Sequence, residues 1–211
     1  MTPQEIMTLQ QWAQQGFPKA QCVLGLAYHY GDGVAVDMEK ALYWYRKAAE
    51  QGYPDAQSEL GLCYHNGDGV ARDVTRAVYW YEKAAKSGVP EAQYNLALCY
   101  FCGEGVACDR LKGVMLCTKS ANQGYVLAQY LLGEIHNGNF GCKKNEEKAA
   151  FWYQKAAEQG HVDAEIQLCI AYRDGKGVPK NMKLAEYWVE KALEQGSERA
   201  KEVRMFLYIN E

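Results

Sequence analysis

The chain repeats itself every 36 residues, and this period constrains its fold more than any other feature of the sequence. The dipeptide Ala-Gln shows the period most clearly, at Ala20-Gln21, Ala56-Gln57, Ala92-Gln93 and Ala128-Gln129. Glycine follows the same period without exception, at Gly52, Gly88, Gly124, Gly160 and Gly196. A chain of 211 residues built in this way is an array of one unit, in which each copy buries its apolar face against its neighbours.

Each unit is predicted to contain two helices. In residues 18–31, apolar side chains recur at the spacing of one helical face, and Gly31 follows as a residue that accepts a left-handed helix end. Residues 38–51 form the second predicted helix, with Ala41, Trp44 and Tyr45 on one side. The position before this helix holds only Asp or Asn, as a helix N-cap requires, at Asp37, Asp73, Asp109, Asn145 and Asn181. The tryptophan column (Trp44, Trp80, Trp152 and Trp188) is expected to pack between the helical layers.

The stretch Gly31-Asp32-Gly33-Val34 could be taken for a ligand-binding loop. A P-loop needs a following Gly-Lys-Ser/Thr, and a calcium loop needs alternating acidic ligands with a closing Glu. Neither is present, and the Gly-x-Gly pattern returns at Gly67, Gly103 and Gly175 between predicted helices. We therefore interpret it as an interhelical turn.

The predicted fold is all-α, an α/α solenoid of about five full repeats with a half repeat at each end. The boundaries are those of a single domain, 1–211, divided into 1–17, 18–53, 54–89, 90–125, 126–161, 162–197 and 198–211. The polar end segments suit capping helices.

Composition limits the possible functions. With 23 basic and 26 acidic side chains, the chain lacks the clustered positive charge of a nucleic-acid binder. It shows no apolar run long enough to cross a membrane and no signal peptide, so a cytoplasmic location is expected.

The eight cysteines fall at unequal positions of the repeat and are expected to be mostly buried small hydrophobes. Cys99-x-x-Cys102 suggests zinc, but no second such pair follows, and no metal or cofactor is predicted.

The segments "AQYNLALCY", "GDGVARD" and "RAVYWYEKAAKSG" resemble the Sel-one-like repeat (SLR) family, a relative of the tetratricopeptide repeat. The resemblance covers essentially the whole chain and implies an α/α superhelix that serves as an adaptor or binding scaffold. Secreted cysteine-rich members carry one disulfide in each repeat, a pairing that this sequence lacks. The third unit departs from the family pattern at Gly113, Leu116 and Cys117, which indicates either drift or a local change in curvature.

By analogy with tetratricopeptide arrays, the first helix of each unit lines the concave side. Its side chains opposite the core vary between units and include large aromatic residues, as expected of a peptide groove. The predicted binding residues are His29, Tyr30, His65, Tyr94, Phe101, Tyr130, Ile166 and Arg173. Tyr94, Phe101 and Tyr130 are expected to form one apolar strip, flanked by cations that favour an acidic or C-terminal partner segment.

Nothing in the sequence requires catalysis, and no catalytic residue is predicted. The leading hypothesis is a non-enzymatic scaffold that binds a protein or peptide in the concave groove, without nucleic-acid binding or membrane insertion. The alternative is a secreted virulence or immunity-type factor that engages a specific protein, and a hydrolase or antibiotic-binding enzyme ranks last. The sequence does not predict an oligomeric state.

Overall fold

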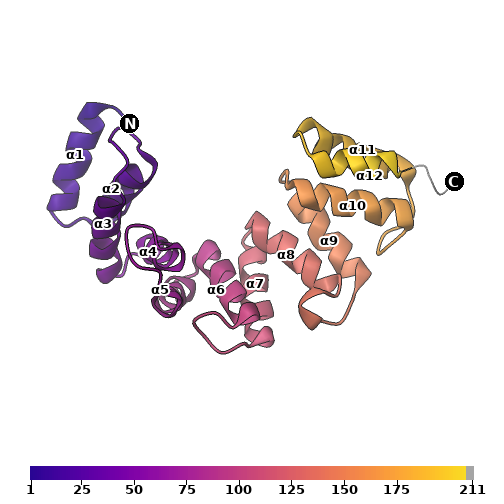
Figure 1. Cartoon of the computed structure of the whole chain (residues 1–211), viewed down its shortest axis with the longest axis horizontal. Coiled ribbons are helices and arrows are strands. Elements are labelled where there is room, and N and C mark those ends of the chain that lie inside the picture. The colour runs from indigo at the N-terminus through magenta and orange to yellow at the C-terminus, as the bar shows by residue number, and fades with distance from the viewer. Residues whose placement is uncertain (208–211) are drawn as a thin grey trace. The chain divides into compact units, whose positions relative to one another are not determined.

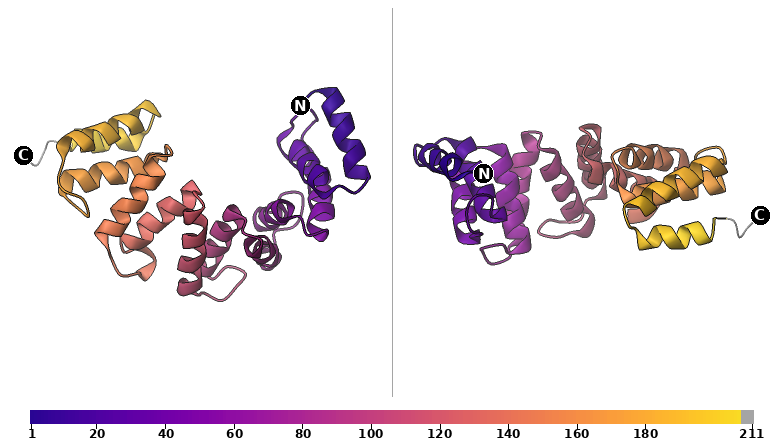
Figure 2. Two further views of the ribbon diagram at one scale, coloured as in Figure 1. Left: turned by 180° about the vertical axis from the view of Figure 1, so that it is seen from behind. Right: turned by 90° about the horizontal axis from the view of Figure 1, so that it is seen from above.

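The computed structural model describes residues 1–207. They fall into two compact units, one spanning Met1–Gly113 and one beginning at Val114. Each unit is a stack of helices in which consecutive helices lie side by side (Figures 1 and 2). The last four residues of the expected C-terminal half repeat, 208–211, lie outside the described residues.

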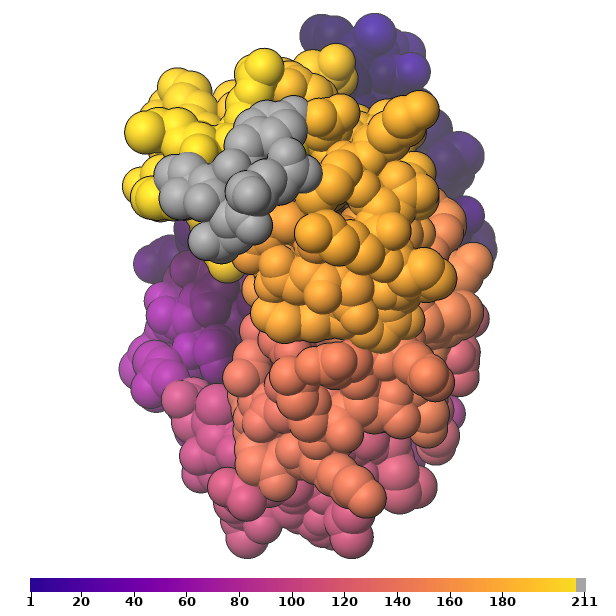
Figure 3. Space-filling view, turned by 90° about the vertical axis from the view of Figure 1, so that its right-hand side faces the viewer, coloured from indigo at the N-terminus to yellow at the C-terminus, as the bar shows by residue number. Residues whose placement is uncertain are grey.

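The first unit contains α1 (Pro3–Gln14), α2 (Pro18–Tyr30), α3 (Met38–Glu50), α4 (Pro54–Asn66), α5 (Val74–Lys86) and α6 (Pro90–Cys102). Helix α7 (Arg110–Asn122) crosses the boundary between the units. The second unit continues with α8 (Val126–His136), a short 3-10 turn η1 (Asn139–Gly141), α9 (Glu146–Ala157), α10 (Val162–Asp174), α11 (Met182–Glu194) and α12 (Glu198–Met205). The described residues contain no strand, and the predicted all-α solenoid of two-helix repeats is confirmed. Figure 3 faces the second unit, whose α10–α11 region (orange) lies as a layer on the α9 region (salmon).

The predicted helix ends are confirmed at atomic detail. The Asp37 carboxylate accepts a hydrogen bond from the backbone N–H of Lys40 at 3.0 Å, and the other four N-cap residues accept the equivalent bond. Gly31 ends α2 in the left-handed conformation, with φ of 75°. Both features satisfy backbone groups that a helix end leaves without a partner.

The second glycine of each Gly-x-Gly turn seats that turn against the preceding repeat. Gly69 has a φ of 68°, and a Cβ atom there would lie 2.7 Å from the carbonyl oxygen of Met38, at the start of α3. A Cβ on Gly105 would lie 2.6 Å from the carbonyl oxygen of Val74, at the start of α5. Glycine is required here because any side chain would push the two repeats apart.

The recurring glutamine of the Ala-Gln dipeptide joins successive repeats through buried hydrogen bonds. The Gln57 amide donates to the carbonyl oxygen of Ala49 at 3.2 Å, and Gln21, Gln93 and Gln129 make the equivalent bond. The oxygen of Gln21 in turn accepts from Gln51 at 2.7 Å. Buried amides that are satisfied in this way fix the register of one repeat on the next.

Within a repeat, a tyrosine ring packs on a glycine of the first helix. Tyr45 is fully buried, and a Cβ atom on Gly25 would lie 2.6 Å from its ring. Gly61 with Tyr81 repeats this pair. The neighbouring tryptophan column is less buried than expected: Trp188 is buried, but Trp44, Trp80 and Trp152 are only half-buried. The tyrosine therefore fills the interhelical core, while the tryptophan closes its edge.

Candidate functional site: the surface of the first helices

The first helices of the repeats (α2, α4, α6, α8 and α10) have little free surface. Each packs against the second helix on either side of it within its unit, and α4 also contacts α6, as α8 contacts α10. What remains in each unit is a strip at the positions of Leu26, His29 and Tyr30 and their equivalents in the other repeats of that unit. We call this strip the first-helix surface.

Ile166 does not belong to this surface, contrary to the sequence-based prediction. Its side chain is fully buried in the core of the second unit, where Val126 and Tyr130 pack against the same cluster. The equivalent positions Cys22 and Ser58 are also buried. The prediction was wrong because it treated this position as facing solvent, whereas helices packed on both sides bury it.

Phe101 is a second correction. Its side chain is only 8% exposed, and its ring lies over Gly113 of α7, where a Cβ atom would be 2.8 Å from the ring. Phe101 therefore serves as core and cannot join Tyr94 and Tyr130 in a continuous binding strip. The same contact explains one departure of the third repeat, because Gly113 provides the room that the Phe101 ring needs.

Tyr30 is the most exposed of the predicted residues. It stands at the end of α2 with 68% of its surface exposed. The His29 ring lies beside it, with ring centroids 4.5 Å apart, and the His29 Nδ1 atom is 3.5 Å from the hydroxyl of the buried Tyr45. His29 thus connects the exposed ring to the core.

The predicted cations His65 and Arg173 are each engaged by an acidic neighbour. The His65 Nε2 atom lies 3.8 Å from a carboxylate oxygen of Glu104. The Arg173 guanidinium donates to Asp174 at 2.6 Å, and the two cations Arg173 and Lys176 hold the pKa of Asp174 down to about 2. Local ion pairing therefore reduces the positive charge that these residues offer a partner.

Tyr94 and Tyr130 are both half-buried, and they belong to different units. Tyr130 stacks on the ring of His161 with centroids 4.4 Å apart and planes 19° apart. Burial raises the pKa of Tyr130 to about 12, so its hydroxyl stays protonated at neutral pH. Tyr130 occupies the same repeat position as Ile166, and it packs against the core cluster of the second unit while staying partly exposed.

Glu59 of α4 is a residue that the sequence analysis missed. Its Oε2 atom is buried and has no hydrogen-bond partner. Burial, aided by repulsion from Glu91 and Asp55, raises its pKa to about 7, and burial also raises the pKa of Glu91. The first helices of the first unit therefore carry two half-buried carboxyl groups, Glu59 and Glu91, where the histidines had suggested positive charge. The available signal was a carboxylate at a position that holds Val23, Asn95, Leu131 and Gln167 in the other repeats.

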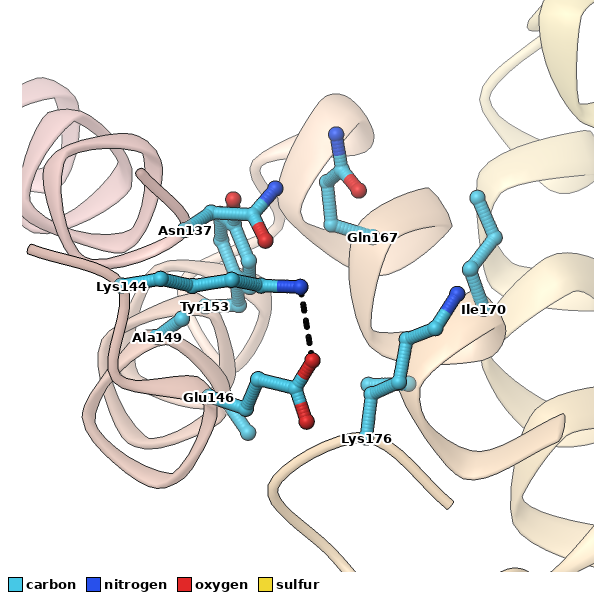
Figure 4. A pocket seen from close by; sticks show the side chains of 10 residues that line it. Asn137, Lys144, Glu146, Ala149, Tyr153, Gln167, Ile170 and Lys176 are labelled. Carbon is cyan, nitrogen blue, oxygen red and sulfur yellow. Dashed lines mark ion pairs between the residues drawn. The ribbon is translucent and has the colours of Figure 1, made fainter. Parts of the chain in front are cut away.

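A polar pocket of about 210 Å³ opens in the second unit between the α8–α9 turn, α9 and α10 (Figure 4). The Lys144 ammonium lies 2.7 Å from the Glu146 carboxylate, and Lys176 points into the same space from the far side. Asn137 and Gln167 present amide groups above them. Asn137 occupies the repeat position of His29, so the pocket is continuous with the first-helix surface.

The irregular turn of the fourth repeat shapes this pocket. Helix α8 has 11 residues, whereas α2, α4, α6 and α10 each have 13. Gly138 has a φ of 103°, and Phe140 has a φ of 58°, the one positive value at a non-glycine position among the described residues. The early helix end leaves Asn137 at the pocket rim instead of inside a helix. Non-glycine residues in this conformation are uncommon and are enriched at functional sites.

The second helices carry a different and highly regular pattern of aromatic pairs. Tyr43 packs edge-on against Trp44 with centroids 4.9 Å apart, and Lys47 lies over the Tyr43 ring. The pairs at Tyr79, Phe151 and Tyr187 repeat this geometry. Because the pattern is the same in four repeats, it is explained by packing, and it provides matched control positions for tests of the first-helix surface.

Among residues 1–207, no group of three or more His, Cys, Asp or Glu side chains is placed to hold a metal ion. No helix in the same range is both long and apolar enough to cross a bilayer.

Tandem two-helix repeats, joined by Gly-x-Gly turns and buried glutamines, define an α/α solenoid of the kind that carries binding surfaces. The chain belongs to the Sel1 repeat family, whose model matches five consecutive segments, 18–53, 54–89, 90–125, 126–161 and 162–197. These are the five repeats predicted from the Ala-Gln period. Sel1 repeat proteins generally act as protein-interaction scaffolds and are typically non-enzymatic.

Solved structures of relatives share this fold. A Sel1 repeat protein from Oxalobacter formigenes is 35% identical with a TM-score of 0.89, over 96% of this chain and 58% of that one. A protective antigen of uropathogenic Escherichia coli strains with an SLR fold is 32% identical (TM-score 0.59), over 92% and 50% of the two chains. An immunity protein from Pseudomonas aeruginosa is 27% identical (TM-score 0.60), over 90% and 72%. The chain thus spans about half the length of the first two relatives, and no curated protein matches it.

Proposed function

We propose that this protein is a non-enzymatic scaffold that binds a partner protein or peptide along its first-helix surface. The observation that carries the proposal lies on the first unit, where the Glu59 Oε2 atom is buried without a hydrogen-bond partner. On the same unit, the pKa of the Tyr30 hydroxyl is raised by partial burial and, to a smaller extent, by the charge of Glu59. An aromatic ring beside an unsatisfied carboxylate offers both contact area and a specific polar contact.

The energetics favour a donor on the partner. A buried polar atom without a hydrogen bond costs about 1–3 kcal/mol, and a lysine, arginine or backbone N–H group from a partner would remove that cost. A cation would also favour the ionised form of Glu59 and relieve its repulsion from Glu91. The partner segment that suits the first unit therefore presents a basic side chain next to an apolar one that covers Tyr30.

The test compares two tyrosines of similar exposure on opposite helices of one repeat. Partners are captured from a native lysate with the unaltered chain, and their affinity for the purified Tyr30→Ala and Tyr43→Ala variants is then measured by biolayer interferometry. Tyr30 is 68% exposed on the first helix, and Tyr43 is 52% exposed on the second. We expect Tyr30→Ala to weaken binding at least about tenfold, as for a central aromatic anchor, and Tyr43→Ala to change it less than about twofold. Equal effects, or a larger effect of Tyr43→Ala, would place the interface elsewhere.

A second candidate function is neutralisation of one specific protein, as an immunity-type factor. It is favoured by the similarity to the immunity protein from Pseudomonas aeruginosa, which extends over 90% of this chain. This function requires a stoichiometric complex that inhibits the activity of the partner. Titrating the captured partner with the purified chain distinguishes the two, because a scaffold leaves the partner's activity unchanged.

For location we propose the cytoplasm. All eight cysteines are free, and five of them are buried, at Cys22, Cys63, Cys99, Cys117 and Cys169. A reducing compartment keeps such thiols free. Thiol titration of the denatured native-source protein without reductant tests this location, and four disulfides would contradict it.

A further inference from the structure

We infer that copies of this chain associate end to end, with α12 of one copy packed on α1 of the next. The first helix carried by one copy and the second helix carried by another would then complete one repeat. Such a head-to-tail contact joins two different surfaces, so it produces closed rings or open filaments. The inference goes beyond the proposed scaffold function, because it concerns the ends of the repeat array.

Helix α1 corresponds to the second helix of a repeat, and no helix precedes it in the chain. Its residues lie one period before those of α3, so Leu9 takes the position of Tyr45 and Trp12 takes that of Ala48. Trp12 is 52% exposed. In the complete repeats this position is fully buried, at Ala48, Ala84, Ser120, Ala156 and Ala192. The side of α1 that faces a first helix in other repeats is therefore open.

This open side is part of an apolar groove of about 490 Å³ on α1 and α2. The groove is lined by Leu9, Trp12, Phe17, Ala20 and Val23, with Lys19 as the one charged lining residue. The internal repeats show what covers the equivalent surface. Tyr45, one period after Leu9, is fully buried, and a Cβ atom on Gly25 of the first helix α2 would lie 2.6 Å from its ring. The groove thus has the position and the apolar character of a surface that a first helix covers.

Helix α12 is a first helix, and no second helix follows it among the described residues. Its residues lie five periods after those of α2, so Met205 takes the position of Gly25 and Glu202 takes that of Cys22. Met205 is 72% exposed. A solenoid end that remains in water needs a polar outer face. The exposed Met205 and Trp12 therefore favour ends that are covered.

The side chains that would meet at this contact differ in size from those inside the array. Inside a repeat, Gly25 lies on the large ring of Tyr45, whereas α12 would place Met205 on the smaller Leu9. Trp12 is larger than the alanine at its position in other repeats, so the two helices would lie further apart than within a repeat. Because tight packing depends on such complementarity, we expect an association that is weak and reversible.

The charges of α12 favour a second copy of this chain as the occupant of the groove. Four of its five charged residues are paired within the chain, as Arg199–Asp163, Lys201–Glu198 and Arg204–Glu190. Glu202 is the fifth, and it has no ion pair among residues 1–207. The groove residue Lys19 is exposed and also has no ion pair within that range.

The repeat register relates these two charges to each other. Burial raises the pKa of Cys22, and the charges of Glu59 and Asp55 raise it further. Cys22 is the equivalent of Glu202, and Asp55 is the equivalent of Lys19 in the following repeat. Charges at these two positions therefore interact, and a lysine with a glutamate there would attract each other across the contact.

The experiment exchanges these charges and measures self-association of the whole chain by sedimentation velocity. The unaltered chain should associate as its concentration rises from about 10 µM to about 1 mM. We expect Lys19→Glu and Glu202→Lys each to weaken the association at least about tenfold, because like charges then meet at the contact. An equimolar mixture of the two variants should recover it, since only contacts between the two variants pair a lysine with a glutamate. The control Lys183→Glu, at an exposed position of α11, should associate as the unaltered chain does, and circular dichroism establishes that each variant is folded.

The opposite results overturn the inference. A chain that stays monomeric over this range would mean that a different protein covers the apolar groove. Association that neither substitution weakens, or that the mixture does not recover, would show that α1 and α12 do not form the contact. Equal weakening by Lys183→Glu would show a general effect of charge. Because no partner is present in these measurements, their failure leaves the result for Tyr30 and the scaffold function unaffected.

Discussion

The ring of Phe101 occupies the space that a side chain on Gly113 would need, since a Cβ atom built on Gly113 lies 2.8 Å from the ring. In the first two repeats, the equivalent positions carry His29 or His65 on the first helix and Ala41 or Ala77 on the second. Compared with these two repeats, the third repeat thus has a larger residue on its first helix and a smaller one on its second helix. Its glycine is required by packing, so sequence drift does not explain this position.

Replacing Gly113 by alanine should therefore destabilise the protein. In an open helix, Gly→Ala is stabilising by about 1 kcal/mol, but here the added methyl group overlaps a buried ring and should cost about 1–3 kcal/mol net. Denaturant unfolding of Gly113→Ala, Phe101→Leu and the double variant measures this. The double variant should recover most of the loss, and a stabilising effect of Gly113→Ala alone would show that the ring moves aside freely.

Glu165 stands where four other repeats have a buried glutamine, and it is 1% exposed. It accepts a hydrogen bond from Gln195 at 3.0 Å, and burial raises its pKa above the ordinary range. A raised carboxyl pKa means that the folded state binds more protons, so stability falls as pH rises through that pKa. We expect Glu165→Gln to stabilise the protein by about 1 kcal/mol at pH 8, through an amide that can donate to the preceding repeat. The gain should be smaller at pH 5, and the reverse change Gln129→Glu should destabilise.

Glu59 should make stability depend on pH near neutrality. Its pKa is raised from 4.5 to about 7, so its contribution to stability is greatest below pH 4.5 and is lost as pH rises through 7. Since one pKa unit corresponds to about 1.4 kcal/mol, Glu59→Gln should be more stable than the unaltered chain by up to ~3 kcal/mol at pH 8. Unfolding in urea at pH 4.5, 6 and 8 provides the comparison. A stability difference that does not change with pH would mean that Glu59 titrates normally.

The eight thiols should react in distinct groups. Cys102 and Cys108 are exposed, and Cys142 is partly exposed. Burial raises the pKa of Cys22, Cys63 and Cys117 to about 12 and that of Cys99 and Cys169 to about 11, so these five are both inaccessible and protonated. With an aromatic disulfide reagent at pH 8, two thiols should react quickly, one more slowly, and five only on unfolding. Fast reaction of four or more in the native protein would contradict the burial of the cysteine positions.

The candidate site was predicted only in part from the sequence. Tyr30 is exposed, as the prediction of a binding surface requires, but Phe101 and Ile166 are buried and were assigned to that surface wrongly. A helical position can be assigned to the solvent-exposed surface only when every neighbouring helix is known. The first helices of this protein contact helices on more than one side. Glu59 and the lysine pocket were missed because their properties arise from groups far apart in the sequence.

The sequence by itself determined the number of repeats, their boundaries and the ends of their helices. Those features depend on interactions within a few residues, such as Asp37 with the N–H group of Lys40 or the left-handed turn at Gly31. The 36-residue period repeats the same kinds of residue in every copy, which makes these local signals recognisable. Only the tertiary structure decided that Tyr45 rather than Trp44 fills the core, and that Glu59 keeps a buried oxygen without a partner. It also brought Lys144 and Lys176 to one pocket. These outcomes depend on volume and desolvation where separate helices meet, which no local pattern records.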